Sequence, residues 1–191
     1  FKKWVVGTAA RAMAPGSSLD GCLTLVGPPG VGKTRFFRNM LPEPFDSRTG
    51  EIYCSIKNPR QFTESIIGKT IACFDELSQL SDSKMEDVFK QLITSENIDV
   101  RLAYRRDPQR YELRQGFAAT SNSEKCIPNE TFSRRLWIIK LGQERLNFEF
   151  VNKNNKKLWQ EACYYAKQGF RTYLNREEQE HLEKINKNHL K

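Results

Sequence analysis

Gly-Pro-Pro-Gly-Val-Gly-Lys-Thr, residues 27–34, matches the phosphate-binding pattern G-x-x-x-x-G-K-[ST] at every fixed position. The glycines let the backbone curl so that its N–H groups point inward at phosphate oxygens. The lysine brings an ammonium group to the β- and γ-phosphates, and the threonine offers a hydroxyl to Mg²⁺. The predicted nucleotide-binding residues are Gly27, Pro28, Pro29, Gly30, Val31, Gly32, Lys33 and Thr34.

The two flanks of this loop decide between a phosphate site and a plain flexible Gly/Pro turn. Residues 22–26 are apolar and predict a buried strand, and residues 34–40 predict the opening of a helix. A helix N-terminus favours an anion, so the strand–loop–helix order supports the phosphate site.

The composition is that of an ordinary globular domain. The chain has 191 residues, of which 38% are hydrophobic and 28% charged, and no apolar run reaches the roughly 18–20 residues of a membrane helix. Because the chain begins at Phe1, we expect it to be a piece of a longer protein. Five cysteines without a C-x-x-C spacing argue against structural zinc or a disulfide framework and fit a cytoplasmic location. The net charge of +8 is what a nucleic-acid binder would carry.

Short apolar strands separated by helical patterns predict a parallel α/β sheet. We divide the chain into an N-terminal helix and connector (1–20), a phosphate-loop core (21–145) and a C-terminal helical segment (146–191). Beyond the phosphate loop, the predicted elements are helices over 2–13, 62–67, 81–95 and 155–168 and from Asn175, strands at 70–74, 116–120 and 136–139, and mostly connection at 46–61.

Polar side chains follow two of the predicted strands. Asp75 and Glu76 come after the strand at 70–74; the aspartate would hold Mg²⁺, and the glutamate would activate water against the γ-phosphate. Asn122 closes the strand at 116–120 and would position that water or bind the γ-phosphate. The alternatives are an acidic turn and an Asx turn, both common after strands.

Two arginines, Arg134 and Arg135, precede the strand at 136–139. A guanidinium aimed at the γ-phosphate stabilises transition-state charge, and in a ring ATPase the neighbouring subunit would supply it. The alternatives are a solvated basic pair or an arginine tied to a carboxylate. The sequence does not distinguish which of the two would act.

A hairpin is predicted from residues 100–104 and 111–113, which alternate around Asp107-Pro108-Gln109. Arginines that contact phosphates and tyrosines that stack on bases would make it a platform for single-stranded DNA. The alternative is a solvated strand face with structural ion pairs. The predicted DNA-binding residues are Arg101, Tyr104, Arg105, Arg106 and Arg110.

In this order the motifs resemble the virulence-associated protein E family, which is related to AAA+ and superfamily 3 helicases of mobile genetic elements. The resemblance extends from the leading helix at 4–13 to the polar helix after Leu174. It rests on Gly68-Lys69, Glu76-Leu77, Asp99-Val100-Arg101 with Tyr104, Thr120-Ser121-Asn122, Arg134-Arg135-Leu136-Trp137, Leu158-Trp159 and Glu161-Ala162. The family more often has Gln at position 29 and Ser-Thr at 34–35, and superfamily 3 helicases usually carry Lys at the hairpin tip.

The resemblance implies an α/β phosphate-loop NTPase fold of AAA+ or superfamily 3 type, with a mostly parallel central sheet flanked by helices and a small helical C-terminal part. It implies a replication role in a phage, phage satellite or genomic island, within the bacterial host cytosol or as a viral protein in the host cell. It also implies a primase-like domain in the full-length protein, a DNA-gripping hairpin and a double arginine acting in trans.

The leading hypothesis is an Mg²⁺-dependent ATPase that assembles as a hexameric ring and moves along single-stranded or forked DNA as a helicase, with no membrane partner. One rival is a DNA-binding initiator or loader that does not unwind. Another is a nucleotide or small-molecule kinase, with Arg105, Arg106 and Arg110 in a closing lid. A GTPase is disfavoured because the sequence lacks an N-K-x-D signature.

Overall fold

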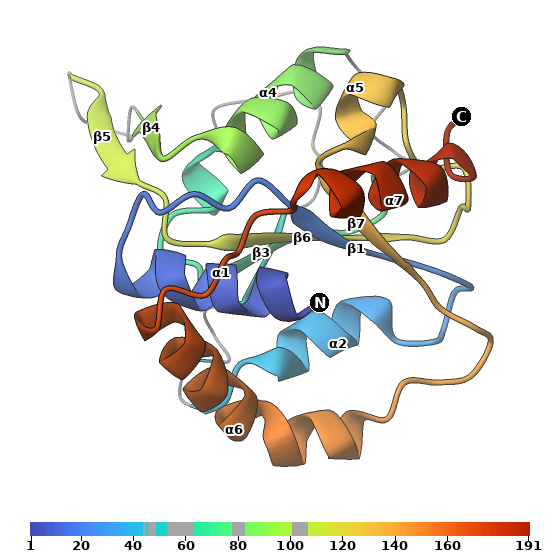
Figure 1. Ribbon diagram of the computed structural model, residues 1–191, viewed down its shortest axis with the longest axis horizontal. Coiled ribbons are helices and arrows are strands. Elements are labelled where there is room, and N and C mark those ends of the chain that lie inside the picture. Colours follow the sequence, from blue (N-terminus) through green and yellow to red (C-terminus); the bar gives the residue numbers. More distant parts are fainter. Residues whose placement is uncertain (44, 46–48, 53–62, 78–82, 101–106) are drawn as a thin grey trace.

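A parallel five-stranded sheet forms the centre of the molecule in the computed structural model, which describes the chain except residues 44, 46–48, 53–62, 78–82 and 101–106 (Figure 1). The strand order is β2-β3-β6-β1-β7, and all four pairings are parallel, as the sequence predicts. The strands are β1 (Cys22–Val26), β2 (Thr49–Ile52), β3 (Ile71–Phe74), β6 (Gly116–Ser121) and β7 (Leu136–Lys140).

Helices cover both faces of this sheet, so the architecture has three layers (Figure 1). One face carries α1 (Lys2–Met13), α2 (Lys33–Met40) and α6 (Phe148–Lys167). The other face carries α4 (Ser83–Thr94) and α5 (Glu130–Ser133). The last helix, α7 (Arg176–Lys187), packs against the edge strand β7, and its Leu182 joins the core under α1, α2 and α6.

Alternation along the strands divides the interior into two cores. In β1, Cys22 and Val26 join the core under α4 and α5, whereas Leu23 and Leu25 join the core under α1, α2 and α6. Trp4 of α1 is fully buried in the second core, and its indole N–H donates to the carbonyl of Phe117 in β6 at 2.7 Å. Because both faces are covered, the central strands are buried and mostly apolar, which made them recognisable in the sequence.

The predicted hairpin exists as a separate antiparallel pair, β4 (Asn97–Val100) and β5 (Gln109–Glu112). Its strands begin earlier in the sequence than predicted, at 97 rather than 100 and at 109 rather than 111. Four of the five predicted DNA-binding residues, Arg101, Tyr104, Arg105 and Arg106, lie outside the described residues.

The sequence did not predict one short strand and predicted one helix too short. Residues 46–61 were predicted to be mostly connection, yet β2 lies there at the edge of the sheet; its register beside β3 is a long-range pairing that local polarity does not reveal. The helix predicted over 155–168 begins at Phe148 because Asn147 caps it, its side chain accepting from the N–H of Phe150 at 2.9 Å. The last helix does begin at a capping box between Asn175 and Glu178.

None of the helices in the described part of the chain combines the length and apolar character that crossing a membrane would require.

Candidate nucleotide site

The phosphate loop joins the end of β1 to the start of α2. Gly30 and Gly32 adopt positive φ values of +85° and +93°, a left-handed backbone that suits glycine. Gly32 is also the N-cap of α2 and packs against the ring of Phe148, where a Cβ would come within 2.2 Å of the ring. Only glycine fits at this position, for both reasons.

Lys33 is folded back over the loop. It is only 6% exposed, and its ammonium donates to the carbonyls of Gly27 at 2.7 Å and Pro28 at 2.8 Å and to Asn122 Oδ1 at 2.8 Å. Burial lowers the pKa of this lysine, and the nearby carboxylates of Glu76 and Asp75 oppose that shift. The three acceptors hold the charge where the motif predicts the phosphates to lie.

Asp75 lies directly after β3 and faces the same loop. Its Oδ1 accepts from the hydroxyl of Thr34 at 2.9 Å and from that of Thr120 at 2.8 Å. The two residues predicted to hold Mg²⁺, Thr34 and Asp75, are therefore in direct contact.

Glu76 is the only described non-glycine residue with positive φ, at +57°. Its carboxylate accepts from the backbone N–H of Asn122 at 3.1 Å and from the Asn122 side-chain amide, and it lies 3.2 Å from Ser121 Oγ. A left-handed glutamate after a strand stores backbone strain of the kind that occurs at functional sites.

Asn122 is the centre of this arrangement, because its amide contacts both Lys33 and Glu76. The strand order explains why these residues meet. β6 lies between β1 and β3, so the end of β6 falls between the phosphate loop and the acidic pair. All three strand ends lie at the carboxyl edge of a parallel sheet, the usual location of a ligand site.

The donors present suit magnesium. A hydroxyl and a carboxylate are hard oxygen ligands, and Mg²⁺ commonly binds through one or two protein oxygens together with phosphates and water. Within the described ranges, no group of three or more His, Cys, Asp or Glu side chains forms a metal site of its own. A metal at Thr34 and Asp75 would therefore depend on the nucleotide phosphates for further ligands.

Three further residues contact this cluster, and the sequence alone assigned none of them an individual role at the site. Thr120 and Ser121 precede Asn122 and present hydroxyls to Asp75 and Glu76, a role that their place at a strand end could have indicated. Phe148 contacts Gly32 from more than a hundred residues away, and no local pattern predicts it.

The double arginine lies at the opposite edge of the sheet. Arg134 and Arg135 precede β7, and the Arg135 carbonyl accepts from the N–H of Cys22 at 2.8 Å, where β1 begins. The five residues of β7 span about 16 Å at roughly 3.3 Å per residue. The arginines therefore lie about one strand length away from the loop at 27–34 of the same chain.

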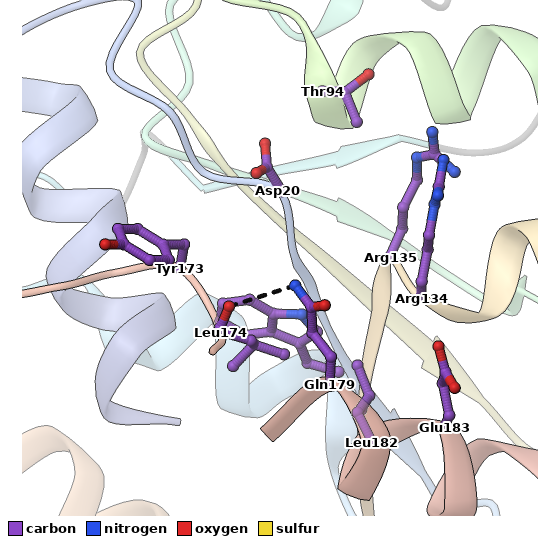
Figure 2. Close-up of a pocket in the computed structure, with 10 residues that line it drawn as sticks. Asp20, Thr94, Arg134, Arg135, Tyr173, Leu174, Gln179, Leu182 and Glu183 are labelled. Atoms are coloured by element: carbon purple, nitrogen blue, oxygen red, sulfur yellow. Dashed lines mark hydrogen bonds between the residues drawn. The ribbon is translucent and has the colours of Figure 1, made fainter. Parts of the chain in front are cut away.

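A pocket of about 430 Å³ lies beside these arginines (Figure 2). Both arginine side chains extend from the α5–β7 turn in the same direction in this view, and Gln179 and Glu183 of α7 contribute to the wall. The β4–β5 hairpin is also at this amino edge, because β5 leads directly into the start of β6. Arg110, the one described residue of the DNA-binding prediction, is exposed on β5.

The family model of the virulence-associated protein E-like domain matches residues 1–191, the whole sequence. The chain belongs to this family. No curated protein matches the sequence.

Solved structures similar to this virulence-associated protein E-like domain include two apo structures of the NrS-1 C-terminal region. The first has a TM-score of 0.64 at 16% identity, with 95% of this chain and 46% of that chain covered. The second, an A form, has a TM-score of 0.62 at 14% identity, with 96% and 46% covered. The domain thus spans less than half of the NrS-1 chains, and at these identities the likeness shows the fold alone.

Proposed function

We propose that this domain hydrolyses ATP and moves along DNA as part of a ring, in the replication protein of a mobile genetic element. The observation that carries the ATPase assignment is the cluster of Lys33, Asp75, Glu76 and Asn122 around the phosphate loop. A phosphate loop alone indicates nucleotide binding. A carboxylate and an amide facing the loop from the two adjacent strand ends are what water attack on the γ-phosphate requires.

The residues of the cluster have distinct roles in this proposal. The loop N–H groups and Lys33 bind the phosphates, and Lys33 exchanges its carbonyl acceptors for phosphate oxygens. Thr34 and Asp75 hold Mg²⁺, which neutralises charge on the phosphates. Glu76 accepts a proton from the attacking water, and Asn122 orients that water. The Asn122 side-chain amide also donates to the Glu76 carboxylate, so the group that would orient the water lies directly beside the group that would accept its proton.

The position of the arginines supports a ring. A guanidinium at the γ-phosphate is a large contribution to phosphoryl transfer, yet Arg134 and Arg135 lie a full strand length from their own loop. A head-to-tail neighbour would bring the amino edge of one molecule to the carboxyl edge of the next, and such contacts close into rings. We take the hexamer from the superfamily 3 resemblance.

The hairpin is the proposed DNA contact. It stands apart from the central sheet at the edge that carries the arginines (Figure 1), so a change at one subunit interface can move it. The net charge of +8 and the exposed Arg110 suit a phosphate backbone. ATP and Mg²⁺ would be the ligands, and single-stranded or forked DNA the partner.

Replacement of Lys33 tests the ATPase assignment. We expect Lys33→Ala to abolish phosphate release, because the variant loses the ammonium that lies over the loop. Lys156→Ala, which removes an exposed lysine of α6, is the matched control and should keep the wild-type rate. Undiminished phosphate release by Lys33→Ala would refute the site.

Two further measurements separate the rivals. Transfer of phosphate to an acceptor without free-phosphate release would indicate a kinase. DNA-stimulated hydrolysis without strand separation would indicate a loader rather than a helicase.

A further inference from the structure

One buried amide holds the arginine turn from both sides. Asn186 of α7 is fully buried, and its Nδ2 donates to the carbonyl of Ser133 at 2.8 Å and to that of Leu136 at 2.9 Å. These carbonyls flank Arg134 and Arg135 in the chain. A primary amide suits this task because its single nitrogen carries two donors.

Packing alone does not explain an asparagine at this position. Its Oδ1 is buried without a hydrogen-bond partner among the described residues, and burial of an unpaired polar atom costs free energy. An apolar side chain would fill the site without that cost. The asparagine amide instead donates two hydrogen bonds to the turn, which an apolar side chain cannot do.

The two arginine side chains differ in burial and in hydrogen bonding. Arg135 is half-buried, and its Nη1 donates to the carbonyl of Thr131 at 2.9 Å. Burial lowers the pKa of Arg135, and the neighbouring charge of Arg134 lowers it further. Arg134 is exposed, and no side chain or carbonyl in the described part of the structure accepts a hydrogen bond from it.

We infer that Arg134 is the guanidinium offered to a neighbouring molecule's nucleotide, and that Asn186 is a positioning residue that holds its turn. Arg135 anchors the same turn beside the pocket of Figure 2. The C-terminal helix α7 thereby controls an ATP site that lies in another subunit. This inference rests on the proposed ring ATPase.

Mixing of inactive variants tests the inference. Arg134→Ala keeps an intact phosphate loop but has no guanidinium to offer its neighbour. Lys33→Ala has an inactive phosphate loop but keeps Arg134. In an equimolar mixture about a quarter of the interfaces would pair an intact loop with an intact arginine, so about a quarter of the wild-type rate should return. Arg135→Ala should retain more activity than Arg134→Ala.

Asn186→Ala should behave like Arg134→Ala rather than like Lys33→Ala. We expect its rate to fall about 10- to 100-fold, the effect of a misplacement of the order of 1 Å, while its affinity for a fluorescent ATP analogue stays within twofold. Mixing with Lys33→Ala should restore activity, and mixing with Arg134→Ala should not. Asn188→Ala, an exposed asparagine at the end of the same helix, is the matched control and should keep the wild-type rate.

The isosteric variant Asn186→Asp separates donation from packing. It keeps the side-chain size but turns an acceptor toward two carbonyls, so its rate should be at least as low as that of Asn186→Ala. A rate near wild type for Asn186→Asp would overturn the positioning role. So would restoration of Asn186→Ala by Arg134→Ala, because Asn186 would then act at its own loop.

Hydrogen exchange tests the role of Asn186 even if mixed variants recover no activity. If Lys33→Ala and Arg134→Ala do not restore each other, the shared site is refuted and Arg134 loses its assignment. Hydrogen exchange then judges Asn186 separately. The amide of Arg135, which donates to the Phe132 carbonyl at 3.1 Å, should exchange faster in Asn186→Ala and not in Asn188→Ala. Unchanged exchange would overturn the positioning role.

Discussion

Replacement of Gly32 by alanine tests how the phosphate loop is built, and Gly30→Ala provides its matched control. Both glycines have similar positive φ values, +93° and +85°, in the same loop. Their surroundings differ. A Cβ at position 30 meets nothing within 4 Å, whereas one at position 32 comes within 2.2 Å of the Phe148 ring.

The difference in surroundings sets the expected magnitudes. Left-handed backbone costs an ordinary residue about 1–2 kcal/mol, and the loss of glycine entropy in the unfolded chain returns about 0.4–1 kcal/mol. Gly30→Ala should therefore lower the free energy of unfolding by about 1 kcal/mol. Gly32→Ala adds an overpacking cost of about 1–3 kcal/mol, which gives about 2–4 kcal/mol in total.

Urea denaturation followed by circular dichroism measures both variants. With a slope of about 2 kcal/mol per molar, the midpoint should fall by about 0.5 M for Gly30→Ala and by about 1–2 M for Gly32→Ala. The slope itself should not change, because neither substitution alters the surface exposed on unfolding.

A double-mutant cycle with Phe148→Ala locates the cause. In that background the overlap is gone, so Gly32→Ala should cost only about the 1 kcal/mol of its backbone strain. Equal midpoints for the two single variants, or an undiminished cost of Gly32→Ala beside Ala at 148, would refute the reasoning. Phe148 begins α6, so the result also tells whether this helix supports the phosphate loop.

Three other predictions concern the site and the cores. Asn122→Ala should reduce phosphate release by about 10²-fold while ATP binding persists, because Lys33 stays at the loop and only the group predicted to orient water is lost; an unchanged rate would contradict that role. Burial raises the pKa of the Cys126 thiol to about 11, above its ordinary value of 9, so the folded chain binds more protons than the unfolded chain between these pH values. The free energy of unfolding should therefore fall as the pH rises from 9 to 11, and by less in Cys126→Ala; equal slopes with pH would contradict this. Trp4→Phe should lower the free energy of unfolding by about 2 kcal/mol in urea titrations, since the Phe117 carbonyl loses a buried donor; a loss below about 0.5 kcal/mol would show that the bond is dispensable.

The backbone of the loop at 27–34 could be predicted from the local sequence. The pattern at 27–34 has glycines where the curled loop needs a left-handed backbone, and Gly30 and Gly32 adopt that conformation. Asp75, Glu76 and Asn122 could be placed at strand ends because each follows a buried and mostly apolar strand. The edge strand β2 was not predicted, because the pattern of polar and apolar residues along it does not reveal its pairing with β3.

The sequence by itself determined a parallel α/β domain with a phosphate loop and the candidate groups around it, since each of these depends on residues close together in the chain. Only the tertiary structure decided the order of the strands, which inserts Asn122 between Lys33 and Glu76 and puts Arg134 and Arg135 at the far edge. It also supplied the contacts of Phe148 with Gly32 and of Asn186 with Ser133 and Leu136. These contacts join residues at least 50 positions apart, and such pairs are brought together by the packing of both cores rather than by any local preference.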